Sequence, residues 1–418
     1  MEDREWRKEN GGSSPLIIHT ECSKGWGGQE IRILEELRGM RQYGLSTALA
    51  APKESQIFQR AETEGFAVWP VKFASNADIS SFVSLLRLIG RLHPTVVNTH
   101  SSKDSWIAGC AARVMKVPLV IRTRHVSTPI GSTFSYRHFP HLILTTSAAI
   151  RENLMQQGLD GRKIIPVPTG IDLKRFRFSA ENRHRIRKHF SLSEKDVLVG
   201  NICVLRSWKG LDFFIETATN MADHFKFILV GDGPQKERLQ DKARQAGLED
   251  RLFFTGHQEN VERFFSALDI FFFTSYASEG VPQSLLQALS VGLPLVVCRT
   301  PSVLETLRSV EGFTSVEYGD LGAARQAMEQ ISETLRTNEN HIIYARRSVL
   351  SRYELENMHR LILDIYQQNR VIFRQAPPQG SGWHRVMKRS LSSPPAKKKS
   401  GFFQQILNLN FPFLKIKR

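Results

Sequence analysis

Two cationic side chains stand three residues apart in the segment Leu205-Arg-Ser-Trp-Lys-Gly210, directly after a short apolar run. Arg206 supplies a planar fork of hydrogen-bond donors and Lys209 a compact charge, and this combination suits a diphosphate. Most Arg and Lys side chains are only solvated surface charges. The position of this pair after a predicted strand favours a binding role, so we predict that both residues contact an anionic group.

A carboxylate marks a second loop. Glu279 precedes a helix that Pro282 can start and Gly292 can end. It could simply satisfy the positive end of the helix dipole, an interaction worth about 0.3–1 kcal/mol. In a cleft, it would instead accept hydrogen bonds from sugar hydroxyls. The next two residues, Gly280 and Val281, offer backbone N–H groups at the same helix end.

Glycine-rich turns follow two other predicted strands. Gly27 and Gly28 precede a predicted helix, whose N-terminus suits an anion. Gly231 and Gly233 supply two of the three glycines of a dinucleotide fingerprint, but Lys236 stands in the third place. A dinucleotide site is therefore disfavoured, whereas close approach of a flat ligand to the backbone remains an interpretation of this loop. The turn of Gly27 and Gly28 is not a Walker A loop, because no Gly-Lys-Ser/Thr follows it.

Three more polar side chains lie where a cleft would form. His100 and His125 each follow a predicted strand, and Gln287 lies about two helical turns after Glu279. A lone histidine is more often structural, but two at strand ends can stabilise charge across a cleft. The sequence shows no metal-binding histidine spacing and no D-x-D pair, so we predict no metal site.

The elements that must position these residues alternate between strand and helix. One predicted helix covers residues 30–43, between strands of the first half. The predicted strands cover residues 16–20, 46–50, 67–71, 95–99, 118–123 and 141–146, and then 197–203, 226–231, 252–255, 270–274 and 295–298. Near-continuous apolar strands are typical of parallel sheets buried on both faces. The pattern predicts a doubly wound α/β fold, present twice.

Turn-rich segments divide the chain. We predict a hinge around 166–190 and a helical region from Gly322 to about Arg370 that packs across both domains. The predicted parts are a flexible N-terminus (1–14), an acceptor-side domain (15–170), a linker (171–190), a donor domain (191–350), a crossing helix (351–375) and a basic tail (376–418). Ligands of parallel sheets bind at the carboxyl ends of the strands, so the functional loops should face one cleft.

Length and composition exclude several classes of protein. The chain has 418 residues, is 41% hydrophobic and carries a net charge of +16. It can fill a core, so a largely disordered protein is excluded. No apolar run reaches the roughly 20 residues of a membrane span, and residues 1–14 lack the apolar stretch that a signal peptide needs. Four scattered cysteines favour a reducing cytosol over a disulfide framework or a zinc site.

The tail holds most of the excess charge. Residues 376–418 contain nine Lys or Arg and no Asp or Glu, with aromatic residues after a lysine triplet. Such a segment can bind an anionic bilayer surface, with about 1 kcal/mol for each cation near the membrane. A solvated disordered tail is an equal alternative. Nucleic acid is a third, although no recognised nucleic-acid motif supports it.

Together, these motifs resemble the family 4 retaining glycosyltransferases over roughly residues 15–370. The strongest part is Glu279-Gly-Val-Pro-Gln-Ser-Leu-Leu-Gln287, which is similar to the E-x7-E segment of that family. It is supported by Gly231-Asp-Gly-Pro, Lys209-Gly210, Thr169-Gly-Ile-Asp172 and Gly27-Gly28. The resemblance implies the GT-B fold, which has two facing Rossmann-like domains and C-terminal crossing helices.

The resemblance also implies roles for these residues. Arg206 and Lys209 would grip the donor diphosphate and stabilise the departing nucleotide, while Glu279 would hold the hydroxyls of the transferred sugar. His125 would contact the sugar or acceptor near the reaction centre. The groups expected near sugar, phosphate or ribose are Gly27, Gly28, Gly231, Gly233, Gly280, Val281 and Gln287. Two departures stand out: Gln287 replaces the second glutamate, and Val204 stands where the family usually has an arginine.

The expected protein is thus a cytoplasmic, metal-independent retaining glycosyltransferase that needs no cofactor. Its donor would be a nucleoside diphosphate sugar, UDP- or GDP-linked. Its acceptor would be a saccharide or a lipid-linked saccharide of cell-surface polysaccharide or lipopolysaccharide synthesis, reached at the inner face of the membrane through residues 376–418. The alternatives are a nucleotide-sugar epimerase or hydrolase of the same architecture, and a non-catalytic nucleotide- or nucleic-acid-binding protein.

Overall fold

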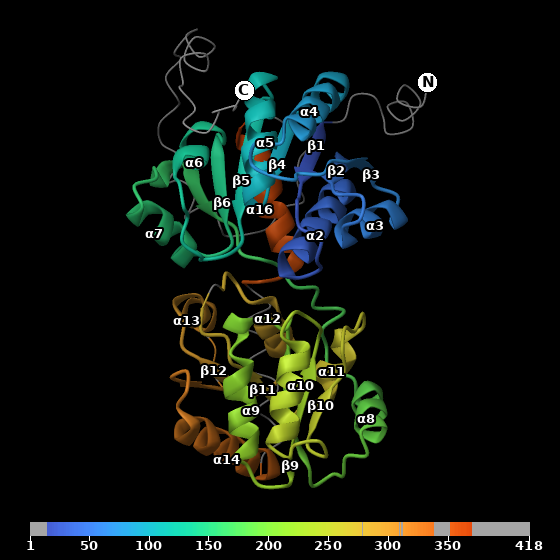
Figure 1. Ribbon diagram of the computed structural model, residues 1–418, viewed down its shortest axis with the longest axis vertical. Coiled ribbons are helices and arrows are strands. Elements are labelled where there is room, and N and C mark those ends of the chain that lie inside the picture. Colours follow the sequence, from blue (N-terminus) through green and yellow to red (C-terminus); the bar gives the residue numbers. More distant parts are fainter. Residues whose placement is uncertain (1–14, 278, 309, 311, 338–351, 370–418) are drawn as a thin grey trace, which may run out of the picture. The chain divides into compact units, whose positions relative to one another are not determined.

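The computed structural model describes residues 15–277, 279–308, 310, 312–337 and 352–369. The predicted N-terminal segment 1–14 and the basic tail 376–418 lie outside these ranges. Within them, the chain forms two parallel sheets with helices on both faces, as the sequence predicts (Figure 1). Both sheets belong to one compact unit. Among the described residues, we find no helix with the length and hydropathy of a membrane span.

The first sheet has seven parallel strands in the order β3-β2-β1-β4-β5-β6-β7. Its strands are β1 (Leu16–Thr20), β2 (Ser46–Ala51), β3 (Ala67–Pro70), β4 (Val96–Thr99), β5 (Leu119–Arg124), β6 (Leu142–Thr145) and β7 (Ile164–Pro166). Its helices are α2 (Gly28–Gln42), α3 (Gln56–Thr63), α4 (Ile79–Leu92), α5 (Ser102–Val114), α6 (Phe134–His138) and α7 (Ala148–Gln156). A short 3-10 turn, η1 (Gly161–Lys163), precedes β7.

The second sheet has six parallel strands in the order β10-β9-β8-β11-β12-β13. Its strands are β8 (Val197–Ile202), β9 (Phe225–Val230), β10 (Leu252–Phe254), β11 (Ile270–Phe273), β12 (Leu295–Cys298) and β13 (Phe313–Val316). Its helices are α8 (Ala180–His189), α9 (Leu211–Thr219), α10 (Lys236–Gln245), α11 (Val261–Ala267), α12 (Gln283–Val291), α13 (Pro301–Leu307) and α14 (Leu321–Thr337), with the 3-10 turn η2 (Ser207–Lys209) after β8.

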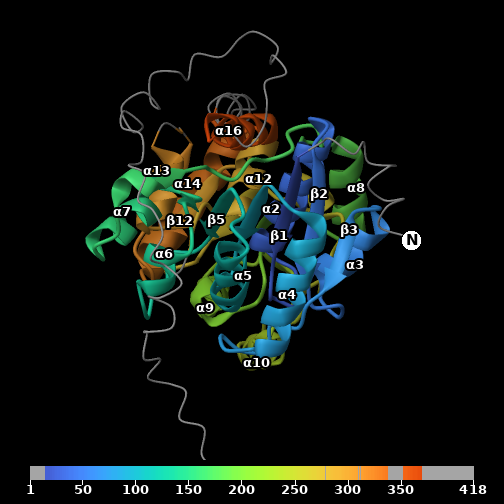
Figure 2. The same cartoon turned by 90° about the horizontal axis from the view of Figure 1, so that it is seen from above.

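Apolar strand faces explain how each sheet is covered. In β2, Ala48 and Ala50 pack in one cluster with α4 and α5, while Leu49 and Ala51 pack in another with α2 and α3. This alternation places helices on both sides of the sheet. Figure 2 shows α4 on the side of β1 away from α16. In the second sheet, all four residues of β11 are at most 1% exposed, as expected for a central parallel strand.

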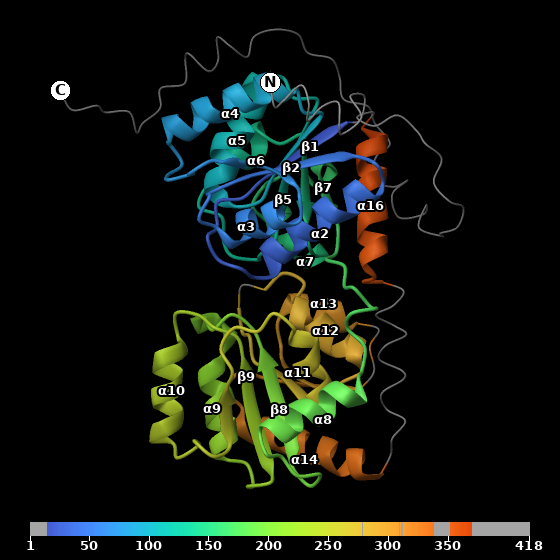
Figure 3. The ribbon, with the colours of Figure 1, turned by 90° about the vertical axis from the view of Figure 1, so that its right-hand side faces the viewer.

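The last described helix, α16 (Leu355–Gln368), returns to the first sheet. It packs against α2 and lies beside the elements of the first sheet in Figures 1 and 3, whereas α14 packs against α9, β12 and β13. The two chain segments that link the sheets also pair, because Ile171 N–H donates to Tyr353 O at 2.7 Å and Leu355 N–H donates to Ile171 O. Helix α16 lies within the predicted crossing helix 351–375. In contrast, α14, which belongs to the region predicted to pack across both domains, packs on the second sheet.

Both sheets have a point where the strand order reverses. In the first sheet it lies between β1 and β4, and in the second between β8 and β11. Loops that leave neighbouring strands in opposite directions separate there and form a crevice for ligands. His100 follows β4, and the loop of Arg206 and Lys209 follows β8. His100 and the loop of Arg206 and Lys209 thus lie at the two switch points, and His125 follows the neighbouring strand β5.

Candidate active site

A buried ion pair lies at the switch point of the second sheet. Lys209 Nζ is 2.6 Å from Glu279 Oε1, and their side chains are only 17% and 10% exposed. Burial opposes the charged form of Lys209, but the carboxylate of Glu279, with a smaller effect of Cys203, leaves the Lys209 pKa above its ordinary value. Lys209 is therefore charged at neutral pH. The structure joins two residues that the sequence predicts separately.

The backbone around this pair is fixed by hydrogen bonds. Thr274 Oγ1 donates to Lys209 O at 2.7 Å, and Ser302 Oγ donates to Glu279 O at 3.0 Å. Gly210 has φ +65°, and a Cβ there would lie 2.1 Å from Thr274 O, so only glycine fits. Thr274 and Ser302 were not predicted from the sequence. Each is a small hydroxyl residue after a strand or within a helix, a pattern too common to single out.

Arg206 remains available for a ligand. Its side chain is exposed, and its guanidinium carbon lies 5.2 Å from the centre of the Trp208 ring. It is near enough to Lys209 to oppose the charge on that lysine. The loop therefore presents the solvent-exposed Arg206 beside Lys209, which is already paired with Glu279.

Gly231 and Gly233 pack one loop against another. Their φ angles are +140° and +158°, and a Cβ at either position would meet the backbone of Cys203 or Leu205 at 1.9–2.7 Å. Leu205 N–H also donates to Asp232 O at 2.9 Å. These glycines therefore hold the loop that leads into Arg206. Their predicted contact with the ligand stays a prediction.

Helix α12 begins and ends as predicted. Pro282 is its N-cap and Gly292, with φ +94°, is its C-cap. Val281 and Gln287 are each 9% exposed. Among the described residues, no hydrogen bond to the Gln287 side chain is recorded, so its amide is available to a ligand.

Residues of the first sheet meet this helix start. A Cβ on Gly280 would lie 2.1 Å from His125 O and 2.5 Å from Thr146 Oγ1, so the absence of a side chain permits this contact. Gln283 Nε2 donates to Gly28 O at 2.7 Å. The structure therefore brings together three sequence-predicted positions, Gly28, His125 and Gly280.

Gly27 and Gly28 adopt no strained conformation. A Cβ on either would make only ordinary contacts of 3.5–3.8 Å, with Glu30, Val204 or Gln283. The fold does not itself require glycine here, which agrees with space kept for a ligand. The Gly27 N–H, however, already donates to Glu30 Oε2 at 2.9 Å. The N–H of Gly27 is therefore occupied and not open to an anion.

A carboxyl cluster that the sequence analysis missed lies beneath this turn. Glu21 is fully buried and accepts hydrogen bonds from Cys22 N, Ser23 N, Gln29 Nε2 and Ser101 Oγ. Burial, and then the nearby Asp104 and Glu30 carboxylates, raise the Glu21 pKa to about 8. Burial also raises the Asp104 pKa to about 6. In the sequence, Glu21 is simply the residue after an apolar strand, so no local pattern predicts its burial.

Three histidines form a line across the ends of β1, β4 and β5. His19 Nδ1 lies 2.9 Å from His100 Nε2, and His100 Nδ1 lies 2.9 Å from His125 Nε2. Burial lowers the pKa of all three, and most strongly those of His100 and His125. In the described part of the chain, the only group that could hold a metal ion is His19, Glu36 and His100. His19 was not predicted, because it lies within the apolar strand β1.

Comparison with protein families agrees with this geometry. Residues 26–175 match the model of Glycosyltransferase Family 4, and residues 182–348 match that of Glycosyl transferases group 1. The chain belongs to glycosyltransferase family 4. The two matches cover the switch-point loops of Gly27, Lys209 and Glu279, and they also include His125 after β5.

Curated relatives of this family 4 protein are glycosyltransferases. One is the UDP-Gal:alpha-D-GlcNAc-diphosphoundecaprenol alpha-1,3-galactosyltransferase of Escherichia coli, 27% identical over 53% of this chain and 62% of the relative. Another is the 2-deoxystreptamine N-acetyl-D-glucosaminyltransferase of Streptomyces fradiae, 28% identical over 44% of each chain. The chain thus spans about half the length of these relatives.

Solved structures establish the GT-B fold. HepE of Anabaena in complex with UDP-glucose superimposes with a TM-score of 0.77 at 17% identity, covering 84% of this chain and 99% of that one. WaaG, a glycosyltransferase involved in lipopolysaccharide biosynthesis, superimposes with a TM-score of 0.64 at 12% identity over 84% and 99%. The predicted fold is confirmed.

Proposed function

We propose that this protein is a retaining, metal-independent glycosyltransferase that uses a nucleoside diphosphate sugar. The observation that carries the proposal is the Lys209–Glu279 pair beside the exposed Arg206 at the switch point of the second sheet. A diphosphate needs cations and a sugar needs hydrogen-bond acceptors, and this loop system supplies both. Family membership and relatives that are themselves glycosyltransferases support the proposal.

In the proposed reaction, the bond between the anomeric carbon and the donor phosphate breaks on the face where the acceptor hydroxyl attacks. The acceptor proton passes to the departing phosphate oxygen, so no protein nucleophile is needed. Negative charge grows on that phosphate, and Arg206 and Lys209 stabilise it. They supply positive charge that a metal ion would otherwise provide. Glu279 accepts hydrogen bonds from sugar hydroxyls, and His125 contacts the sugar or the acceptor.

We propose a saccharide or lipid-linked saccharide of cell-surface polysaccharide synthesis as the acceptor, and UDP or GDP as the donor nucleotide. The name of the E. coli relative supports a diphosphoundecaprenol-linked acceptor. The cationic segment 376–418 would bring the enzyme to an anionic membrane surface. Deleting this segment and measuring sedimentation with anionic and neutral vesicles tests that part. Unchanged sedimentation would overturn it.

The decisive experiment is donor binding by calorimetry with UDP-, GDP-, ADP- and CMP-sugars in EDTA. One donor should bind selectively, and the variant with Arg206→Ala and Lys209→Ala should not bind it. Lys242→Ala is the matched control, because Lys242 also pairs with carboxylates but lies in the last turn of α10. NMR of the product should show the anomeric configuration retained. Donor consumption without an acceptor would instead indicate a hydrolase or epimerase.

A further inference from the structure

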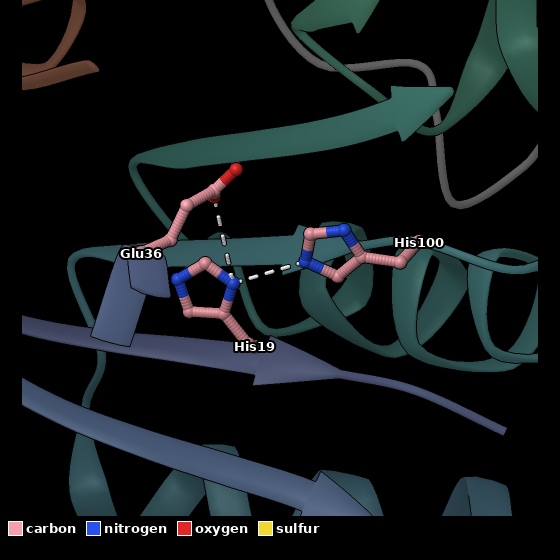
Figure 4. Close-up of side chains that lie close together, drawn as sticks. All are labelled: His19, Glu36 and His100. Carbon is pink, nitrogen blue, oxygen red and sulfur yellow. Dashed lines mark hydrogen bonds and ion pairs between the residues drawn. The ribbon is translucent and has the colours of Figure 1, made fainter. Parts of the chain in front are cut away.

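Three histidines at and beside the switch point of the first sheet form one continuous row of contacting side chains, the histidine chain. They come from three adjacent strands, with His19 in β1, His100 directly after β4 and His125 directly after β5. Their side chains are buried, and His125, at 8% exposed, is the most open. Figure 4 shows His19 between Glu36 and His100, with dashed lines to both. The histidine chain therefore connects the buried Glu36 to the site residue His125.

The distances indicate hydrogen bonds and not shared metal coordination. The two contacts between ring nitrogens are each 2.9 Å, a normal hydrogen-bond length. Two nitrogens bound to one tetrahedral zinc ion at about 2.0–2.1 Å would lie about 3.3 Å apart. The buried Arg32 guanidinium also donates to Glu36 Oε1 at 2.7 Å and supplies the positive charge that this carboxylate needs.

Each neutral imidazole has one N–H group, so the hydrogen bonds of the histidine chain can run in only two directions. In the first, His19 Nδ1–H donates to His100 Nε2 and His100 Nδ1–H donates to His125 Nε2. The hydrogen of His125 then lies on Nδ1. In the second, every bond is reversed, and Nδ1 of His125 is a bare acceptor. Burial keeps all three rings neutral, because it lowers each pKa.

The Glu36 end of the histidine chain favours the first arrangement. His19 Nδ1 is 4.0 Å from Glu36 Oε2, so an N–H there is attracted by the carboxylate, whereas a lone pair is repelled. Among the described residues, His19 Nε2 is buried without a partner. The second arrangement would place an unpaired N–H on this atom, and orphaned buried N–H groups are rarer than unpaired acceptors.

We propose that His100 and His19 are positioning residues that, oriented by Glu36, hold His125 in the tautomer with its hydrogen on Nδ1. No hydrogen bond from the described residues to His125 Nδ1 is recorded, so this N–H is left for the ligand. His125 then acts as a hydrogen-bond donor to a sugar or acceptor oxygen and not as a general base. The catalytic meaning rests on the proposed function, but the tautomer does not.

The direct test is the ¹⁵N NMR signature of His125 in the full chain without substrate, with the signal assigned by its loss in His125→Asn. We expect Nδ1 protonated and Nε2 unprotonated from pH 6 to 8. The opposite pattern, or a fast average of both, would overturn the proposal. So would a stoichiometric zinc ion found by metal analysis and lost on His19→Phe. These readouts stand even if the protein transfers no sugar.

Two variants of nearly equal size separate positioning from packing. His100→Asn keeps an amide N–H close to the place of Nδ1 and should preserve the His125 tautomer and the rate. His100→Leu removes the N–H that donates to His125. We expect kcat to fall about tenfold, which corresponds to one lost hydrogen bond, and KM for the nucleotide sugar to change little. The tautomer should become mixed in the Leu variant alone. Equal losses in both variants with an unchanged His125 signature would overturn the proposal.

Discussion

Lys209 Nζ lies 2.6 Å from Glu279 Oε1, although the two residues are 70 positions apart in the chain. The pair joins the loop after β8 to the loop before α12, on either side of a sheet switch point. A cation and a carboxylate held together can be shared by a ligand that carries both phosphate and hydroxyl groups. In the proposed function, the pair would therefore link diphosphate binding to sugar binding.

Breaking this pair should affect activity and stability differently. Lys209→Met should lower kcat/KM by about 10²–10³, the usual cost of removing one preorganised group that stabilises growing charge. Because it also leaves a largely buried Glu279 unpaired, we expect a loss of about 3 kcal/mol or less in the free energy of unfolding. Adding Glu279→Gln should restore most of the stability and none of the activity. Recovery of activity in the double variant would contradict the proposed role of Lys209.

Gly280 should be essential for a steric reason. A Cβ at this position would lie 2.1 Å from His125 O, which is closer than real Cβ contacts come. We expect Gly280→Ala to displace the start of α12 from His125 and to lower kcat/KM by at least tenfold. Gly131→Ala is the matched control, because its Cβ would meet nothing within 4 Å and its φ is not positive. Steady-state kinetics and thermal unfolding of both variants check this, and equal activity would show that the contact does not matter.

The sequence predicts much of the fold because apolar runs and turn residues alternate clearly. The strand Ile270–Phe273 is an example, since its four successive apolar residues are typical of a central parallel strand, and all four are buried. Two strands were missed. Ile164–Pro166 has only three residues and ends in proline, and Phe313–Val316 is a partly exposed edge strand with two hydroxyl residues. Neither carries the pattern of a central strand.

The site was predicted less completely than the fold. Loop position predicts Lys209, Glu279 and His125 as site residues, because each follows a strand at the carboxyl edge of a sheet. Their partners depend on the packing of distant segments, which a single sequence does not encode in any local pattern. His19 lies inside an apolar strand and Glu21 in an ordinary loop. Both belong to the candidate site only because the fold buries them beside other polar groups.

The buried Glu21 carboxyl should make stability depend on pH. Its pKa is raised to about 8 by burial and by neighbouring carboxylates, whereas an unfolded glutamate titrates near 4.5. Between these values the folded state holds a proton that the unfolded state lacks, so this contribution is greatest below pH 4.5 and is lost as pH rises toward 8. Glu21→Gln should therefore gain stability relative to the native protein as pH rises from 5 to 9, by up to a few kcal/mol. Urea unfolding at both pH values measures it, and a constant difference would refute the assignment.

A substitution at Gly39 would test how α16 packs against α2. Alanine normally stabilises the interior of a helix by about 1 kcal/mol relative to glycine. Here, however, a Cβ on Gly39 would lie 2.4–2.5 Å from the ring of His359, which is only 3% exposed. We expect the clash to prevail, so that Gly39→Ala destabilises the protein by about 1–3 kcal/mol, as overpacking does.

A compensating variant makes this test specific. Adding His359→Ala to Gly39→Ala removes the ring from the clash, and the double variant should be more stable than the sum of the two single changes predicts. Residues in contact show coupling of about 0.5–3 kcal/mol in such a cycle. Denaturant unfolding of all four proteins gives the coupling free energy. A value near zero would show that α16 does not rest on Gly39, because the two substitutions would then act independently.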